Sequence, residues 1–167
     1  MGYGVRQALP GDLDIVVELR FALLVEHSAN PIYSRLRPDA RERARGVYGT
    51  QLGSDREIMF LAHELAAGPA VGVLRCVESL GSPLFYPERY GYVSSAYVRP
   101  AHRRRGVLRL MLASAEQWCV ERGLTEIRLH NASENRDAAA AWATLGFGAV
   151  EELRLRLLHE DSGVPGG

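Results

Sequence analysis

Apolar residues recur at helical spacing in four stretches of the chain, and each stretch has the end signals of a helix. Asp12 and Asp39 are good N-terminal caps for the first two, and Gly53, Gly123 and Gly146 follow the ends of the last three. The pattern predicts helices over residues 13–27, 40–52, 105–122 and 136–145.

Shorter apolar or alternating runs predict six strands, over residues 5–9, 58–65, 70–77, 92–98, 125–129 and 150–158. Three strands in succession indicate antiparallel pairing, and the later strand–helix–strand steps indicate parallel neighbours. In the last run leucines alternate with charged residues, which is typical of a half-buried strand. We expect a single α/β domain with a mixed sheet, helices on its faces and a flexible tail at 161–167.

Composition narrows the class of protein. A chain of 167 residues with 47% hydrophobic residues and zero formal net charge fits one globular domain and argues against a general nucleic-acid binder. No apolar run approaches the roughly 20 residues of a membrane span, and no signal peptide is apparent. Cys76 and Cys119 lie in apolar runs and are expected as buried free thiols, which fits a cytoplasmic protein. The scattered histidines show no metal-ligand spacing.

A cluster of arginines marks the start of the third predicted helix. The strand that ends at Val98 is followed, at the start of the helix, by Arg103, Arg104 and Arg105 before Gly106 and by Arg109 after it. Positive charge at a helix start opposes the helix dipole, and a bound anion relieves that conflict. The turn therefore favours a phosphate or pyrophosphate site. A solvated basic turn and a nucleic-acid contact are the alternatives.

This turn resembles the acetyl-CoA motif of the GNAT superfamily of N-acetyltransferases. That motif reads Val-x-Pro, two residues, then Arg/Gln-x-x-Gly-x-Gly/Ala, and here Val98, Pro100, Arg103 and Gly106 match it. Leu108 departs, because the family usually has glycine or alanine there, and its side chain is expected to crowd the pyrophosphate.

A second motif of the same family follows at the expected distance. Asn135, Ala138 and the Leu-Gly-Phe sequence at 145–147 match it, whereas Trp142 stands where the family usually has tyrosine. The resemblance implies a GNAT domain over residues 1–160. It also implies a mixed, mostly antiparallel sheet of six or seven strands, splayed between the fourth and fifth, with about four flanking helices.

The resemblance further implies where acetyl-CoA, the cosubstrate, binds. The pantetheine arm would bond to the backbone of Ala96 and Val98 and to Asn135. The pyrophosphate would lie on a turn that carries the matched Arg103 and offers four backbone N–H groups, those of Arg104, Arg105, Gly106 and Leu108.

Acetyl transfer to an amine needs a base for the amine and tolerance of the leaving thiolate. In the family a tyrosine often protonates the thiolate, and Trp142 cannot act as an acid. Many relatives have a glutamate on the fourth strand, where this chain has Ser94 and Ser95. The candidate catalytic residues are therefore Glu64, Ser95, His130 and Trp142, with His63 and Glu78 as further candidate bases.

The acceptor site in the family is built by the loop between the first two helices and the loop before the fourth strand. Here these loops offer carboxylate, imidazole and aromatic groups, namely Glu26, His27, Asn30, Tyr33, Tyr48, Phe85, Tyr86 and Tyr90. They suit an amine-bearing small molecule or a peptide. The resemblance implies a cytoplasmic N-acetyltransferase, possible as a homodimer, and the alternative is an acyl-CoA-binding module without turnover.

Overall fold

A computed structural model of the chain describes residues 2–66 and 68–158. In this part of the chain five strands form one sheet, in the order β1-β2-β3-β4-β5. The strands are β1 (Tyr3–Gln7), β2 (Glu57–Glu64), β3 (Gly72–Leu80), β4 (Arg89–Val98) and β5 (Ile127–Leu129). The α-helices are α1 (Leu13–Glu26), α2 (Ala40–Leu52), α3 (Val107–Glu121) and α4 (Arg136–Thr144). Short 3-10 turns lie at Pro10–Asp12, Tyr33–Arg35 and Pro100–His102.

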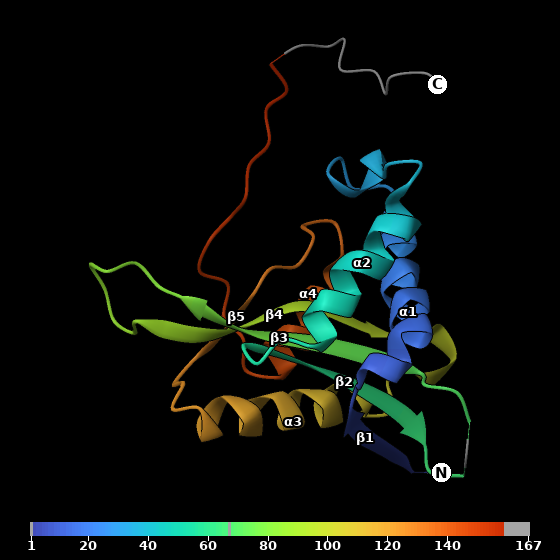
Figure 1. Cartoon of the computed structure of the whole chain (residues 1–167). Helices are drawn as coiled ribbons and strands as arrows, with labels where there is room; N and C mark the ends of the chain where they lie inside the picture. The colour runs from blue at the N-terminus through green and yellow to red at the C-terminus, as the bar shows by residue number, and fades with distance from the viewer. Residues whose placement is uncertain (1, 67, 159–167) are drawn as a thin grey trace.

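The sheet is mixed, as the order of elements predicts. The first four strands pair antiparallel with their neighbours, and β5 pairs parallel with β4. α1 and α2 cover one face and α3 lies along the other (Figure 1). α4 belongs to the α3 side, because Trp142 packs in the same apolar cluster as the buried face of α3.

Two apolar cores form because alternate residues of a strand face opposite sides of a sheet. On β2, Met59 and Leu61 pack against α1 and α2, whereas Phe60 and Ala62 pack against α3. A strand that is buried on both faces reads as a continuous apolar run, which explains the unbroken stretch at 58–62.

The predicted helices and the first five strands are confirmed, with ends that shift by up to three residues. The strand predicted at 150–158 is wrong. Residues 150–157 are assigned to no strand, and Leu153 is 76% exposed. Alternation requires one buried face, and no neighbouring strand in the described residues provides it. The sheet therefore has five strands here, against six or seven expected, and the tail predicted at 161–167 lies outside the described residues.

None of the helices that the structure describes is long and apolar enough to span a membrane.

Candidate active site

The fourth strand changes character halfway along its length. From Gly91 to Val93 it is bonded to β3 on one side and to β5 on the other. After Val93 it keeps only β3, so the strands splay where the resemblance predicts. The β3 register places Ser95 opposite Arg75 and Val93 opposite Cys76, so Ser94 is the extra residue of a β-bulge. A bulge bends its strand and redirects side chains, which helps β4 to leave β5.

A cavity of about 800 Å³ fills the space that the splayed strands leave. Its floor is β4 from Val93 to Val98, and one wall is the start of α3. The opposite wall is the end of β5, the following loop and α4, including His130 and Asn135. The end of α1 and the loop after it complete the rim. The cavity therefore brings together segments that are distant in the sequence.

The turn at the start of α3 has the backbone of an anion site. Arg104 and Gly106 both have left-handed φ angles, of 60° and 82°. Leu110 is the first residue of this helix that donates its N–H to a backbone carbonyl, that of Gly106 at 3.0 Å. The N–H groups of residues 107–109, between Gly106 and Leu110, lie at the start of the helix, where the helix dipole is positive. An ideal Cβ on Gly106 would meet nothing within 4 Å, so the turn is open.

Arg103 braces this turn through its side chain. Its Nε donates to the carbonyl oxygen of Val98 at 2.7 Å, and its terminal nitrogen lies 2.7 Å from a carboxylate oxygen of Glu26 on α1. The guanidinium also lies 5.5 Å from the centre of the Tyr97 ring. These contacts engage Nε and one terminal nitrogen of Arg103, so the side chain ties the turn to β4 and α1.

Comparison with known proteins agrees with this geometry. The family model described as "Acetyltransferase (GNAT) family" matches residues 23–147, from the end of α1 to the turn after α4. The chain belongs to the GNAT family of acetyltransferases.

Individual relatives are more distant. An aminoglycoside N(6')-acetyltransferase type 1 from Acinetobacter haemolyticus is 35% identical over 63 residues, which are 38% of this chain and 43% of that protein. The match thus spans less than half the length of that relative. Its name refers to acetylation of an aminoglycoside, and the substrate of this chain is not fixed by it.

Solved structures confirm the fold. The aminoglycoside acetyltransferase AAC(6')-Iy, bound to a CoA–acetylneamine bisubstrate analogue, superposes with a TM-score of 0.74 at 20% identity, covering 95% of this chain and 99% of that one. A predicted acetyltransferase from Clostridium acetobutylicum with acetyl-CoA gives 0.75 at 21% identity, and the same coverages. AAC(6')-IG from Acinetobacter haemolyticus gives 0.72 at 22%, again with these coverages.

The predicted cofactor-binding residues of this GNAT domain gather at the cavity, apart from Arg105. The lining contains Ala96, Val98, Arg103, Arg104, Gly106, Leu108 and Asn135. The Leu108 side chain packs partly against the α3 core. The Oδ1 atom of Asn135 accepts the N–H of Ala138 at 3.0 Å and caps α4. This leaves its amide NH₂ as the part of the side chain that can donate to a ligand.

The four predicted catalytic residues do not all line the cavity. Ser95, His130 and Trp142 line the cavity, and Glu64 does not. Glu64 lies at the end of β2, opposite Tyr3, with its Oε1 3.7 Å from Nδ1 of His102. Trp142 is 8% exposed and meets Phe147 edge to face, with ring centres 5.4 Å apart.

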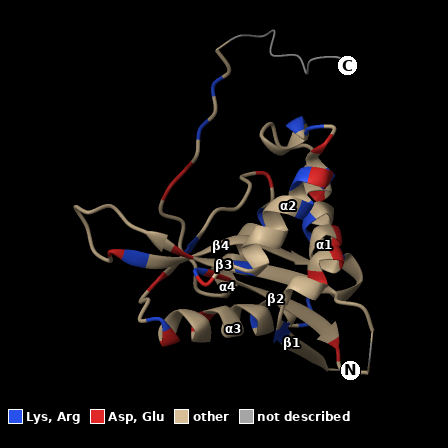
Figure 2. Cartoon of the chain, in the orientation of Figure 1, with Lys and Arg blue, Asp and Glu red and all other residues tan. Residues whose placement is uncertain are grey.

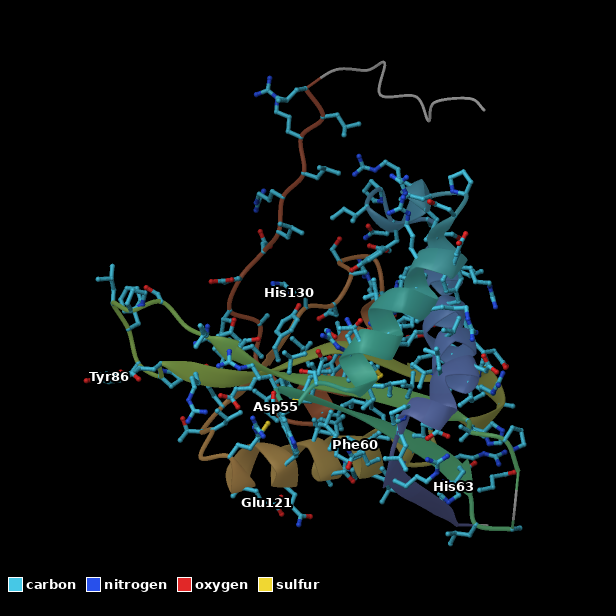
Figure 3. All side chains as sticks on the ribbon, in the orientation of Figure 1. Asp55, Phe60, His63, Tyr86, Glu121 and His130 are labelled. Atoms are coloured by element: carbon cyan, nitrogen blue, oxygen red, sulfur yellow. The ribbon has the colours of Figure 1, made fainter. Side chains whose placement is uncertain are left out.

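The two further candidate bases lie elsewhere. His63 is near the β1 edge of the sheet, on the other side of the molecule from His130 (Figure 3). Glu78 is held by ion pairs with Arg89 and Arg122. These two partners, Arg89 first, lower the pKa of Glu78 below its ordinary value. A carboxylate held in this way is a poor base for an amine.

Of the residues predicted to build the acceptor site, some line the cavity and others lie elsewhere. Glu26, His27 and Tyr33 line the cavity. Tyr48 is buried in the α1–α2 core, where the Arg20 guanidinium lies 3.7 Å from its ring centre. The exposed Phe85 and Tyr86 lie on the loop of the β3–β4 hairpin, which projects from the body (Figures 1 and 3).

Two arrangements at the site depend on tertiary contacts that sequence spacing does not show. Under the bulge, Arg75 donates to Oγ of Ser94 at 2.7 Å and pairs with Glu57, so a partly buried charge pair orients the serine. At the rim, the Asn30 amide donates to the Glu134 carboxylate at 3.1 Å, which joins the loop after α1 to the loop before α4.

A third arrangement concerns His130. The Tyr92 hydroxyl lies 2.6 Å from Nδ1 of His130, and the two rings meet edge to face. Desolvation raises the pKa of Tyr92, so its hydroxyl stays protonated at neutral pH. The parallel register puts Tyr92 beside Arg128, two residues before His130. The pair thus follows from strand pairing across 38 positions.

In the described residues, no three His, Cys, Asp or Glu side chains gather closely enough to hold a metal ion.

Proposed function

We propose that this chain transfers an acetyl group from acetyl-CoA to the primary amine of a small molecule or a peptide, by direct attack in a ternary complex. One observation carries the proposal: a single cavity joins the anion-binding turn of α3, the unpaired edge of β4 and His130. Its volume, about 800 Å³, is that of a site for a sizeable ligand.

The cavity suits a molecule with an anionic end and an amide-containing arm. The turn around Gly106 offers backbone N–H groups to a pyrophosphate. Residues 94–98 of β4 have no β5 partner, so their backbone can bond to pantetheine amides as a neighbouring strand would. The amide NH₂ of Asn135 offers a further donor from the α4 side.

His130 is the base that this geometry supports best. In the tautomer whose Nδ1–H donates to the Tyr92 hydroxyl, Nε2 keeps a free lone pair for a proton of the acceptor amine. The neutral amine attacks the thioester carbonyl carbon, the C–N bond forms and the C–S bond breaks. His130 takes the proton lost by the nitrogen, and Tyr92 holds the imidazole ring in place.

The leaving thiolate has no acid at Trp142, because an indole N–H is not a practical proton donor. We propose that solvent protonates the thiolate and that Trp142 packs against the core. Ser95 is a cavity hydroxyl that can hold that water. Glu64, which lies outside the cavity lining, has no role in this scheme.

Amino sugars are the first acceptors to test. Three of the relatives described above carry names that refer to aminoglycosides, and the acidic side chains of Glu26 and Asp137 line this cavity. All 20 Lys+Arg residues of this chain are arginine. Apart from its N-terminus the protein therefore offers no primary amine of its own, and acetylated product in an assay comes from the added acceptor.

The test compares wild type with His130→Gln and Tyr92→Phe, in a free-thiol assay over a panel of aminoglycosides, polyamines and peptides. We expect turnover on at least one class, a fall of about 100-fold in kcat for His130→Gln and a smaller fall for Tyr92→Phe. The Kd for acetyl-CoA should change in neither variant. Full activity in His130→Gln would contradict the role of His130.

Binding without turnover on the whole panel would instead support the alternative, an acyl-CoA-binding module. A cytoplasmic location, proposed from the free thiols Cys76 and Cys119, is tested separately by fractionation.

A further inference from the structure

Two cysteines that are far apart in the sequence meet inside the protein. Cys76 lies on β3 and Cys119 lies in the last turn of α3, and their sulfur atoms are 3.7 Å apart, in a hydrogen-bond contact between thiols. Both belong to the core on the α3 side of the sheet, where Cys76 is 0% and Cys119 is 3% exposed. Both are free thiols, and the proposed chemistry of the cavity uses neither of them.

A glycine on β4 makes room for this contact. An ideal Cβ on Gly91 would lie 2.6 Å from the Cys119 sulfur and 3.6 Å from the Cys76 sulfur. The two sulfur atoms therefore occupy the space that a side chain at position 91 would take. Because a disulfide bond is about 2.0 Å long, the sulfur atoms need to approach each other by roughly 1.7 Å, which rotation about the two Cα–Cβ bonds can supply.

One of the two thiols borders a groove on the surface. This groove, of about 280 Å³, lies between the end of α3, the beginning of β5 and the turn after α4, and its lining includes Cys119 but not Cys76. A water molecule takes about 30 Å³ of liquid volume, so the groove admits a small oxidant such as hydrogen peroxide. A peroxide that enters the groove therefore meets Cys119 first.

The surroundings of the two thiols also differ in charge. Figure 2 shows basic and acidic residues at the end of α3 that carries Cys119. The hydrogen bond with Cys76 and the charge of Arg122 lower the pKa of Cys119, against the opposing effect of burial. The same hydrogen bond, together with burial, raises the pKa of Cys76. Cys119 is thus the thiol that ionises more readily, and the thiolate is the form that reacts with peroxides.

We propose that Cys76 and Cys119 form a reversible disulfide within the chain when a peroxide enters the groove. The Cys119 thiolate attacks one oxygen of hydrogen peroxide, the O–O bond breaks, and a sulfenic acid forms while hydroxide leaves. The Cys76 sulfur then attacks the Cys119 sulfur, the S–O bond breaks, and the departing oxygen takes the Cys76 proton as water. With the proton that Cys119 gave up, the hydroxide becomes a second water, so two thiols lose two electrons to one peroxide.

The disulfide fastens the end of α3 to the middle of the sheet. α3 begins directly after Gly106, at the turn, and ends shortly after Cys119. Cys76 directly follows Arg75, whose guanidinium holds Ser94 of the cavity. The link spans 43 positions of the chain, and a closure of this kind restricts mainly the unfolded state, so the oxidised protein should resist unfolding more than the reduced one. The proposal stands on the thiol pair and does not rest on the proposed enzymatic function.

The first test uses the folded wild-type protein. It is treated with hydrogen peroxide, unfolded in the presence of iodoacetamide and digested with trypsin without a reductant. Because trypsin cleaves after arginine, the two cysteines fall in the peptides 76–89 and 110–122. These peptides should appear joined, with the mass of two hydrogen atoms lost, and should separate after dithiothreitol. Two alkylated cysteines, or a covalent dimer in non-reducing electrophoresis, would overturn the proposal.

The order of the two steps is tested with Cys76→Ala and Cys119→Ala. Without Cys76 the sulfenic acid has no partner, so dimedone should trap it at Cys119 in the peptide 110–122. In Cys119→Ala, Cys76 should be labelled at least about tenfold more slowly, because it is fully buried and does not line the groove. Equal labelling of the two variants would overturn the proposed attack by Cys119.

Thermal unfolding shows whether the link fits the native fold. The melting temperature of the oxidised wild-type protein should exceed that of the reduced protein by about 5 °C or more. Cys119→Ala is the control, because peroxide should not raise its melting temperature. An equal or lower melting temperature of the oxidised wild type would show that the link forms only in a distorted chain, and would overturn the proposal.

Discussion

Both halves of β4 pair with β3 on one side, but only one half pairs with β5 on the other side. At the paired half, Gly91 to Val93, the strand lies between β3 and β5, and Gly91 is in close contact with α3. The open half, residues 94–98, does not pair with β5, and it forms the floor of the cavity. One strand thus packs into the fold at one end and presents unpaired backbone to the cavity at the other. Substitutions at the two ends should have separable effects.

The largest expected effect concerns Trp142, which belongs to both regions because it packs in the α3 core and lines the cavity. Trp142→Ala should lower the free energy of unfolding by about 3–5 kcal/mol, the usual loss for a large core residue. Denaturant unfolding measures this, and the rate per folded molecule should stay within about tenfold of wild type.

Trp142→Phe is the matched control, since it keeps an aromatic ring against Phe147 and should recover most of the stability. If Trp142→Ala instead kept its melting temperature and lost its rate, the indole would have a chemical role.

The second effect is expected at the open region. Gly106→Trp should weaken acetyl-CoA binding at least 100-fold, about 2.7 kcal/mol, because an indole fills the anion turn. Gly106→Ala is the control. Both variants carry the strain of a side chain at φ 82°, about 1–2 kcal/mol, and only tryptophan adds bulk. Equal affinities in calorimetry of the two variants would remove the turn from the binding site.

The third effect belongs to the paired region. A Cβ on Gly91 would lie 2.6 Å from the Cys119 sulfur and 3.3 Å from an Ile127 carbon. Gly91→Ala should therefore cost about 1–3 kcal/mol of stability and leave the acetyl-CoA Kd unchanged. Gly46→Ala on α2 is the control, because its Cβ would meet nothing within 4 Å and should stabilise the helix. A weakened Kd in Gly91→Ala would show that the two ends of β4 are coupled.

The smallest effect is a pH dependence at the paired end, where Glu78 of β3 lies opposite Gly91. Its pKa is lowered by Arg89 and Arg122, so its stabilisation is present above the ordinary carboxyl range, about pH 4, and is lost as pH falls through the lowered value. Glu78→Gln should be less stable than wild type at pH 7, by under about 1 kcal/mol. Thermal melts should show that difference disappearing in acid, and a constant difference would contradict the ion-pair account.

The contrast between these two regions also shows which features of the molecule can be predicted from its sequence. The helices and inner strands were predictable because their apolar spacing matches the faces they bury, as at 58–62 on β2 and along α3. The turn before α3 could be singled out as a candidate anion site because its arginines and Gly106 are contiguous in the chain, and its binding of an anion stays a prediction. Contiguous features need no tertiary information.

The contacts that the sequence does not predict depend on the register of the paired strands. Tyr92 meets His130 only because β4 and β5 pair as they do, and Arg75 reaches Ser94 only through the bulge. The run at 150–158 was predicted as a strand because its apolar residues alternate with charged ones. Alternation does not show whether a neighbouring strand is present to pair with it, and in the described residues there is none.

The most direct test of the central claim is calorimetric titration of the wild-type protein with acetyl-CoA, with desulfo-CoA and a longer acyl-CoA alongside. If the open half of β4 and the α3 turn form one acyl-CoA site, acetyl-CoA and desulfo-CoA should both bind with micromolar Kd, because both carry the pyrophosphate and the pantetheine arm. The absence of binding by all three ligands would contradict the account and would mean that the side chain of Leu108 closes the turn.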